Sequence, residues 1–169
     1  PKDVSTLQLV INTDMWSAAG LTDADYPTTW DELATVAKKL TSGDHVGLAF
    51  NGEYARIGVF LKQAGGGLVS DDGTKAIAND DKSVAGLQEV KDLLDTGTVK
   101  YASDLGTGWG GEAFGSKKAA MTIEGNWITG GLSKDYPDVK YKVVPLPEGR
   151  AGKGTMHFTN GGGIAADSK

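Results

Sequence analysis

The sequence predicts an α/β fold in which helices pack on both faces of a sheet. Short apolar runs, typical of buried strands, alternate along the chain with longer segments of helical periodicity. Two of these segments, 30–40 and 83–94, repeat apolar residues on one side of a helix. The length of 169 residues fits one domain that can bury a core of its own.

The individual elements follow from apolar runs and from the turn residues between them. Strands are expected at 7–11, 46–50, 119–123, 141–144 and 161–165, and helices at 12–19, 30–40, 54–64, 83–94, 112–115 and after Asn126. Thr29 and Glu32 have the spacing of a capping box, which predicts the start of the helix at 30–40. In the helix at 83–94, the residues expected to form the apolar side are Val84, Leu87, Val90 and Leu94.

The most informative stretch runs from residue 112 to residue 129. It reads as a short helix ending at Gly115, a buried strand at 119–123, a turn and a second helix. Gly125 lies where the strand passes into that helix, so the backbone can approach another group closely, and Asn126 can cap the helix. Trp127 is therefore expected at the carboxyl end of a strand, which is where ligands lie in open α/β sheets.

Charge and composition exclude several classes of protein. The net charge of -5 and the pI near 5.0 argue against a nucleic-acid partner, which needs clustered Lys and Arg. No apolar run approaches the ~20 residues that cross a bilayer. The sequence has no cysteine, and His45 and His157 lack carboxylates at ligand spacing, so it predicts neither a metal site nor a cofactor.

The stretch AFGSKKAAMTIEGNW at 113–127 resembles the extracellular solute-binding proteins of the maltose-binding type, which deliver sugars to ATP-binding-cassette importers. Other stretches agree with that family in the same order: TLQLVINTDMWSAAGL, YPTTWDELATVAKKLT, GLAFNGEYARIGVFLKQAGGGLVSDDG and VPLPEGRAGKGTMHFTNGGGIAADSK. Together they cover nearly the whole chain. The sequence departs from the family at Val10 and Ile11, where aromatic residues are common, and this difference argues against a sugar contact at those two positions.

The resemblance implies a periplasmic-binding-protein-like fold with a mixed sheet. Residues 1–169 are expected to form a single α/β lobe, the second and C-terminal-type ligand-binding lobe of a two-lobe protein, without the partner lobe and the terminal helices. The implied partners are an oligosaccharide, the N-terminal lobe of the same protein and the membrane permease of an importer. The implied location is extracellular or periplasmic, with a membrane anchor in the full-length protein.

The candidate site follows from what a sugar requires. A pyranose stacks its C–H faces on aromatic rings and pairs its hydroxyls with amides, carboxylates and guanidinium groups. Trp127 is the first candidate for stacking, followed by Trp109 in its glycine-rich loop, and the resemblance places Glu53 and Tyr54 in a sugar-contacting loop. The predicted ligand-binding residues are Trp127, Trp109, Glu53, Tyr54, Arg56, Glu124, Gly125, Asn126 and Asn160.

Other residues of the same types are predicted to have structural roles. Trp16 and Trp30 belong to helices with apolar repeats and are predicted to pack in the core. Asn51 is expected to cap the next helix, and Arg56 to pair with Glu53 or with a sugar hydroxyl. Glu124 is expected either to face the cleft or to cap backbone groups.

Two functions remain open from the sequence. The first is a non-catalytic carbohydrate receptor, and the alternative is a glycoside hydrolase or another sugar-active enzyme. Hydrolysis needs two carboxylates about 5–10 Å apart, and Glu53, Glu112 and Glu124 could supply them, but no motif selects a pair. The chain also lacks GxSxG, GxxxxGK[ST] and HExxH motifs, so the sequence favours the receptor.

Overall fold

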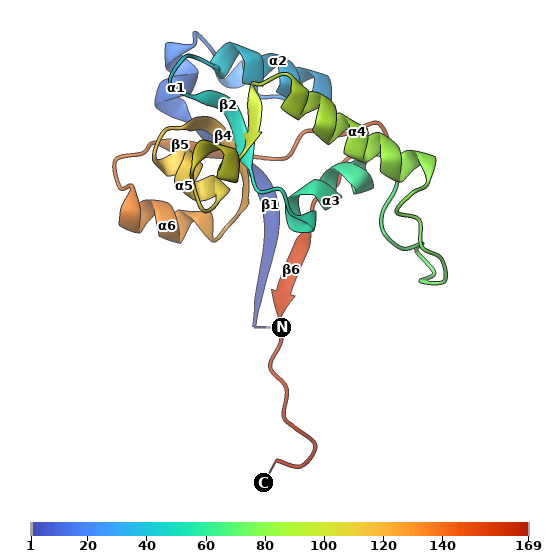
Figure 1. The fold of residues 1–169 in the computed structure, drawn as a ribbon. Coiled ribbons are helices and arrows are strands. Elements are labelled where there is room, and N and C mark those ends of the chain that lie inside the picture. The colour runs from blue at the N-terminus through green and yellow to red at the C-terminus, as the bar shows by residue number, and fades with distance from the viewer. Residues whose placement is uncertain (1, 169) are drawn as a thin grey trace.

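The structure, a computed structural model, describes residues 2–168 and contains a mixed sheet (Figure 1). Within those residues the strand order is β3-β2-β4-β1-β5, and β6 pairs with β1 beyond this path. Strand β2 runs parallel to β3 and β4, whereas β1 is antiparallel to β4, β5 and β6. The predicted α/β class with a mixed sheet is confirmed.

The elements have the following bounds. The strands are β1 Asp3–Asn12, β2 Val46–Phe50, β3 Val99–Tyr101, β4 Ala119–Gly125, β5 Tyr141–Val144 and β6 His157–Asn160. The α-helices are α1 Thr13–Ala18, α2 Trp30–Leu40, α3 Tyr54–Gln63, α4 Asp81–Asp95, α5 Gly110–Gly115 and α6 Ile128–Asp135. Two short 3-10 helices, η1 and η2, span Asp23–Asp25 and Ala102–Leu105.

The side chains of β1 alternate between two apolar layers, which places helices on both faces of the sheet. Leu9 and Ile11 belong to the larger core, which includes residues of α2, α3 and α4. Val10, between them, packs instead with Phe114 of α5 and Ile128 of α6. Figure 1 shows the same arrangement, with α5 and α6 on the opposite side of the sheet from α2.

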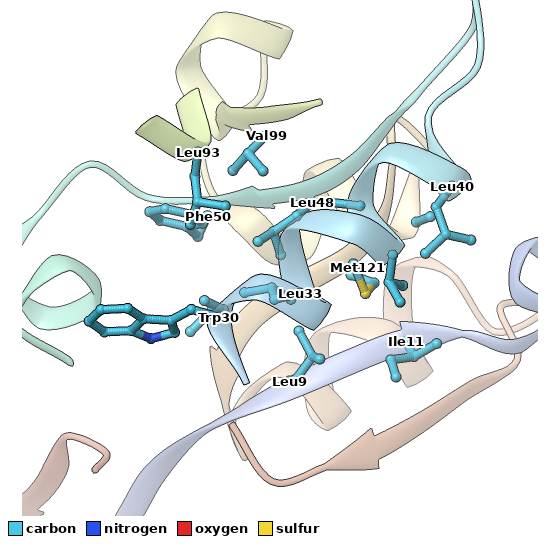
Figure 2. Packing of buried hydrophobic residues seen from close by; sticks show 14 of the residues in the cluster. Leu9, Ile11, Trp30, Leu33, Leu40, Leu48, Phe50, Leu93, Val99 and Met121 are labelled. Carbon is cyan, nitrogen blue, oxygen red and sulfur yellow. The ribbon is translucent and has the colours of Figure 1, made fainter. Parts of the chain in front are cut away.

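Helix α2 packs its apolar side on the centre of the sheet (Figure 2). Trp30 and Leu33 lie near Leu9 of β1 and Phe50 of β2, and all four are buried. The Trp30 indole Nε1 donates a hydrogen bond of 2.7 Å to Gln63 Oε1 at the end of α3, so its polar atom is satisfied inside the core. Trp30 is thus a core residue, as the helical periodicity predicts.

Several predicted elements are confirmed at their bounds, namely α2, β2 and β5. The capping box of α2 is present, since Thr29 accepts from Glu32 N and the Glu32 carboxylate accepts from Thr29 N. Trp16 is buried and donates from Nε1 to Thr22 O at 2.9 Å, which confirms its structural assignment.

The apolar side predicted for α4 is wrong at two of its positions. Val84 and Leu87 are 49% and 44% exposed. The buried residues of α4 are Ser83, Gly86, Val90 and Leu93. A Cβ at Gly86 would lie 2.7 Å from the Cα of Leu61, so the close contact of α4 with α3 needs a glycine there, and this contact sets which side of α4 is buried.

The strand predicted at 161–165 is also wrong. The last strand is β6, His157–Asn160, and residues 161–165 form no strand. Asn160 pairs with Asp3, the first residue of β1, so β1 has no strand residue opposite 161–165. The glycines at 161–163 also lack side chains that could pack.

Strand β6 and the first half of β1 form a two-stranded ribbon that leaves the body of the sheet. Asp3 to Thr6 pair with β6, whereas Leu7 to Asn12 pair with β4 and β5. Figure 1 shows β6 beside this part of β1, pointing away from the helices. Within residues 2–168, none of the helices combines the length and apolar character that a bilayer crossing needs.

Candidate functional site

The carboxyl ends of the three parallel strands meet at one edge of the sheet. Strands β2, β3 and β4 are followed there by Asn51, by η2 and by Asn126. The ring of Tyr101, at the end of β3, lies against the turn after β2, because a Cβ at Gly52 would come 3.2 Å from it. In open α/β sheets this edge is where ligands bind.

A buried carboxylate connects the segments that follow β2 and β4. Glu124, near the end of β4, is 0% exposed, and its Oε2 lies 2.5 Å from Arg56 Nη2 of α3. Arg56 Nη1 pairs with Glu53, the N-cap residue of α3. The same Glu124 oxygen accepts a hydrogen bond of 2.9 Å from the indole Nε1 of Trp127. One oxygen thus holds both the guanidinium and the indole in place.

Burial dominates the electrostatics of Glu124. It raises the pKa of the Glu124 carboxyl, and the charge and hydrogen bonds of Arg56 and Trp127 offset only part of this increase. Within residues 2–168, the second oxygen, Oε1, has no hydrogen-bond partner, and neither has Thr122 Oγ1. The Glu124 carboxyl is fully buried and bonds to the side chains of Arg56 and Trp127, so the expectation that it faces the cleft or caps backbone groups is wrong; it instead positions Arg56 and Trp127.

Gly110, the first residue of α5, lies against these two unpartnered oxygens. A Cβ at Gly110 would come 2.6 Å from Thr122 Oγ1 and 2.8 Å from Glu124 Oε1. The Gly110 N–H donates to Asn51 Oδ1 at 2.8 Å. Asn51 therefore caps α5 rather than α3, the helix that follows it in sequence, so this expectation is wrong.

Trp127 is held in one orientation with part of its ring open. The ring packs on the backbone of Gly125, where a Cβ would come 2.2 Å from Cζ3. Arg56 Cζ lies 5.4 Å from the centroid of the ring, and Phe158 of β6 meets it edge-on, with centroids 5.3 Å apart. The side chain is still 39% exposed, which leaves aromatic surface for a ligand.

Tyr54 extends this surface along α3. Its ring lies over Gly58, and a Cβ there would come 2.9 Å from Tyr54 Cε2 and 3.0 Å from Met156 Cε. Met156 is two residues before Phe158, so both side chains lie on the same side of the extended segment that leads into β6. We call Trp127, Phe158, Met156 and Tyr54 the aromatic wall.

The structure thus brings together six of the predicted ligand-binding residues. They are Glu53, Tyr54, Arg56, Glu124, Gly125 and Trp127. Phe158 was missed and completes their arrangement. The sequence signal for it is the alternation of apolar Met156 and Phe158 with polar neighbours, which is typical of a strand.

Within residues 2–168, the side chains of the other three predicted residues, Trp109, Asn126 and Asn160, form no hydrogen bond or ion pair with the Glu124–Arg56–Trp127 network. Trp109 is half-buried and packs against the apolar cluster that includes Phe114 of α5 and Leu132 of α6. Asn160 is exposed, and its Nδ2 donates to the Asp3 carboxylate at 3.0 Å. Asn126 is exposed and does not cap α6 with its side chain, so that expectation is wrong.

The backbone explains the correction at Asn126. The N-cap residue of α6 is Trp127, which makes no side-chain cap hydrogen bond. The carbonyl oxygen of Asn126 instead accepts from Thr129 Oγ1 at 2.9 Å.

The carboxylates considered for hydrolysis already have partners within the protein. Glu53 and Glu124 both pair with Arg56, and Glu112 Oε2 accepts from Gly108 N at 2.7 Å. Across residues 2–168, no three His, Asp or Glu side chains gather in a way that could hold a metal ion.

The fold is an α/β unit with a mixed sheet, and sequence comparison gives its family. The family model described as bacterial extracellular solute-binding protein matches residues 1–169. The chain therefore belongs to the family of bacterial extracellular solute-binding proteins.

Two solved structures illustrate the similarity. The GacH receptor of Streptomyces glaucescens, solved unliganded and with acarbose, is 29% identical with a TM-score of 0.78, over 93% of this chain and 41% of the receptor. An ABC transporter solute-binding protein of Thermotoga lettingae, bound with α-D-tagatose, is 26% identical with a TM-score of 0.81, over 93% of this chain and 42% of its own.

Curated relatives show the same partial coverage. A protein of Deinococcus radiodurans named "Probable ABC transporter-binding protein" is 28% identical over 142 residues, which are 75% of this chain and 33% of that protein. The chain spans about 40% of the length of the Brucella abortus binding protein that it matches at 24% identity.

Proposed function

We propose that the chain is one lobe of a two-lobe carbohydrate receptor, which binds an oligosaccharide without chemical change and delivers it to an ATP-binding-cassette importer. The observation that carries the proposal is the fixed and partly open indole of Trp127, held by Glu124 at the carboxyl ends of the parallel strands. The acarbose and α-D-tagatose in the two related structures support a sugar as the ligand.

The chemistry of the wall suits a pyranose. The Trp127 ring offers a flat apolar surface for the C–H face of a sugar. Glu53 and Arg56 lie at its side, and the Glu53 side chain is half-exposed, so its carboxylate can accept from sugar hydroxyls. Stacking surface and charged hydrogen-bonding groups thus lie side by side.

The carboxylates favour a receptor over a hydrolase. A glycoside hydrolase needs a carboxylic acid that reaches the glycosidic oxygen and a second carboxylate on the other side of the bond. Glu124 is fully buried, and Glu53 pairs with the same Arg56 as Glu124. These two residues serve better as supports of Arg56 and Trp127 than as an acid and a nucleophile.

The proposed lobe organisation is supported by coverage and by the shape of the site. The chain matches between 33% and 42% of the length of the relatives and solved structures described above, and Trp127 and Tyr54 of the aromatic wall are 39% and 45% exposed, so a second lobe could cover them. The membrane permease of the importer would be the partner. The family is described as extracellular, and we propose a membrane anchor in the full-length protein.

A thermal-shift screen of saccharides on the full-length protein tests this function. A sugar that binds only the folded state raises the melting temperature with increasing concentration. The same mixtures, analysed by chromatography after long incubation, should contain the sugars intact. Release of shorter saccharides would contradict the receptor and favour the hydrolase.

A further inference from the structure

A hollow lies beside Tyr54, at one end of the aromatic wall. It has a volume of about 500 Å³ and lies between α3 and the segment that follows that helix. Its lining includes the glycines at 65–67 and the side chains of Tyr54, Lys62, Leu68, Val69, Asp71 and Ile77. This volume lies in the range of small-molecule sites, about 300–1,000 Å³.

The segment that forms the outer side of this hollow is held in shape by a buried hydroxyl. Ser83 of α4 is 0% exposed, and its Oγ lies 2.7 Å from Ile77 O and accepts from Gly67 N at 3.0 Å. Ile77 N donates to Leu68 O at 2.9 Å, which closes the segment across its base. A lining fixed in advance loses little conformational entropy when a ligand binds.

The lining combines apolar surface with a polar rim. Tyr54, Leu68 and Val69 are large apolar side chains that remain about half exposed. Lys62 and Asp71 face each other across 3.7 Å, and both side chains are open to solvent. An apolar ligand would form no hydrogen bonds with this charged pair. A pyranose has C–H faces that can pack on the apolar side chains and hydroxyls that can hydrogen-bond to Lys62 and Asp71.

Tyr54 belongs to both surfaces. It lines the hollow, and it meets Met156 over Gly58 in the aromatic wall. The wall continues from Met156 to Phe158 and Trp127. Tyr54 is therefore the residue at which the hollow adjoins the aromatic wall.

We propose that this hollow is a subsite for the distal units of an extended oligosaccharide whose first unit stacks on Trp127. This inference rests on the proposed carbohydrate-binding function and specifies its ligand class, which is a saccharide longer than two units. Tyr54 would contact the unit at the junction, and Leu68, Val69 and the Lys62–Asp71 pair would contact the units beyond it.

Calorimetry of the full-length protein with three homologous series tests the inference. The probes are the di-, tri- and tetrasaccharides of α-1,4-linked glucose, β-1,4-linked glucose and β-1,4-linked xylose. In a series that binds, we expect the tetrasaccharide to bind at least about tenfold more tightly than the disaccharide, because more surface is buried in a preformed site.

Surface variants separate the subsite from the rest of the wall. The double variant Leu68→Ser and Val69→Ser should lose the gain from chain length while its affinity for the disaccharide is unchanged. Leu87→Ser is the matched control, because Leu87 is as exposed as Leu68 but does not line the hollow. Its affinities should equal those of the wild type at every length.

The results distinguish a failure of the subsite from a failure of the receptor function. If a disaccharide binds but the tetrasaccharide binds no better, or if the double variant weakens all lengths equally, the subsite is overturned and the receptor function stands. If no member of the three series binds, and the wider thermal-shift screen also finds no sugar, the receptor function itself fails and the subsite with it.

Discussion

Glu124 and Trp127, three residues apart, are joined by a hydrogen bond of 2.9 Å from the indole Nε1 to Oε2 of the buried carboxylate. Gly125 between them allows the ring to lie flat on the backbone. The polar edge of the indole is thereby turned inward and satisfied. What remains exposed is apolar ring, the part of a tryptophan that a sugar contacts.

Replacement of Trp127 by Ala should weaken sugar binding by about 1–3 kcal/mol and leave the fold nearly intact, because stacking surface is lost at the edge of the structure. Titration calorimetry and thermal unfolding of the unliganded variant measure the two effects. Trp30→Ala is the control, and it should destabilise the protein by about 3–5 kcal/mol because Trp30 is buried in the core. A comparable loss of stability in Trp127→Ala would show that Trp127 is a core residue.

Glu124→Gln should change how stability depends on pH. Because burial raises the pKa of Glu124 above its ordinary value of 4.5, the folded state holds this proton more tightly than the unfolded state. The contribution of Glu124 to stability is therefore greatest below pH 4.5 and falls as the pH rises through the folded pKa. Since Gln stays neutral, the free energy of unfolding of the variant relative to the wild type should increase as the pH rises from 4.5.

Urea unfolding of both proteins between about pH 3 and pH 8 measures this difference. Glu32→Gln is a control of opposite sign, because hydrogen bonds from Thr28 lower the pKa of Glu32. The wild type should be favoured over that variant above the ordinary pKa of Glu32 and lose this advantage as the pH falls. A pH-independent difference for Glu124→Gln would contradict the role of burial.

Gly110→Ala should destabilise the protein, because the new Cβ would meet Thr122 Oγ1 at 2.6 Å and Glu124 Oε1 at 2.8 Å in a buried place. Gly130→Ala is the matched control in α6, where nothing lies within 4 Å of the added Cβ. We expect that control to gain about 0.5–1 kcal/mol from helix propensity. Denaturant midpoints of both variants give the comparison, and equal stabilities would show that Gly110 is not tightly packed.

The buried side of α4 can be tested in the same way. Leu93→Ala should cost about 2–5 kcal/mol, since Leu93 packs in the core, whereas Leu87→Ala should stay within about 0.5 kcal/mol of the wild type. Chemical unfolding of the two variants measures both values. The reverse order would support the side expected from apolar periodicity.

Elements with local signals could be predicted from the sequence, and elements defined by distant contacts could not. The capping box at Thr29 and Glu32 and the apolar repeat after it determine α2 without reference to any other segment. The buried side of α4 depends on Gly86, whose role appears only once α3 lies against it. Counting apolar residues alone therefore selected Val84 and Leu87, which face solvent.

The same distinction between local signals and distant contacts applies to the candidate site. The order strand, glycine, tryptophan at 123–127 indicates a ligand-facing Trp127 from local sequence alone. Two features depend on the position of α3 near β4 and could not be predicted locally. They are the complete burial of Glu124 and the bonding of its Oε2 to both Arg56 and Trp127. Phe158 was missed because the alternation of apolar residues around it is short, and its strand forms through pairing with β1 at the other end of the chain.

That pairing has a consequence for the order in which the protein folds. Thr155 Oγ1 bonds to Leu7 O across 148 residues, and Phe158 pairs with Ser5. Contacts so distant in sequence carry the loop-closure entropy of nearly the whole chain and form slowly. Phe158 is placed beside Trp127 by this pairing, so we expect a chain that ends before the segment leading into β6 to lack the Phe158 and Met156 part of the aromatic wall.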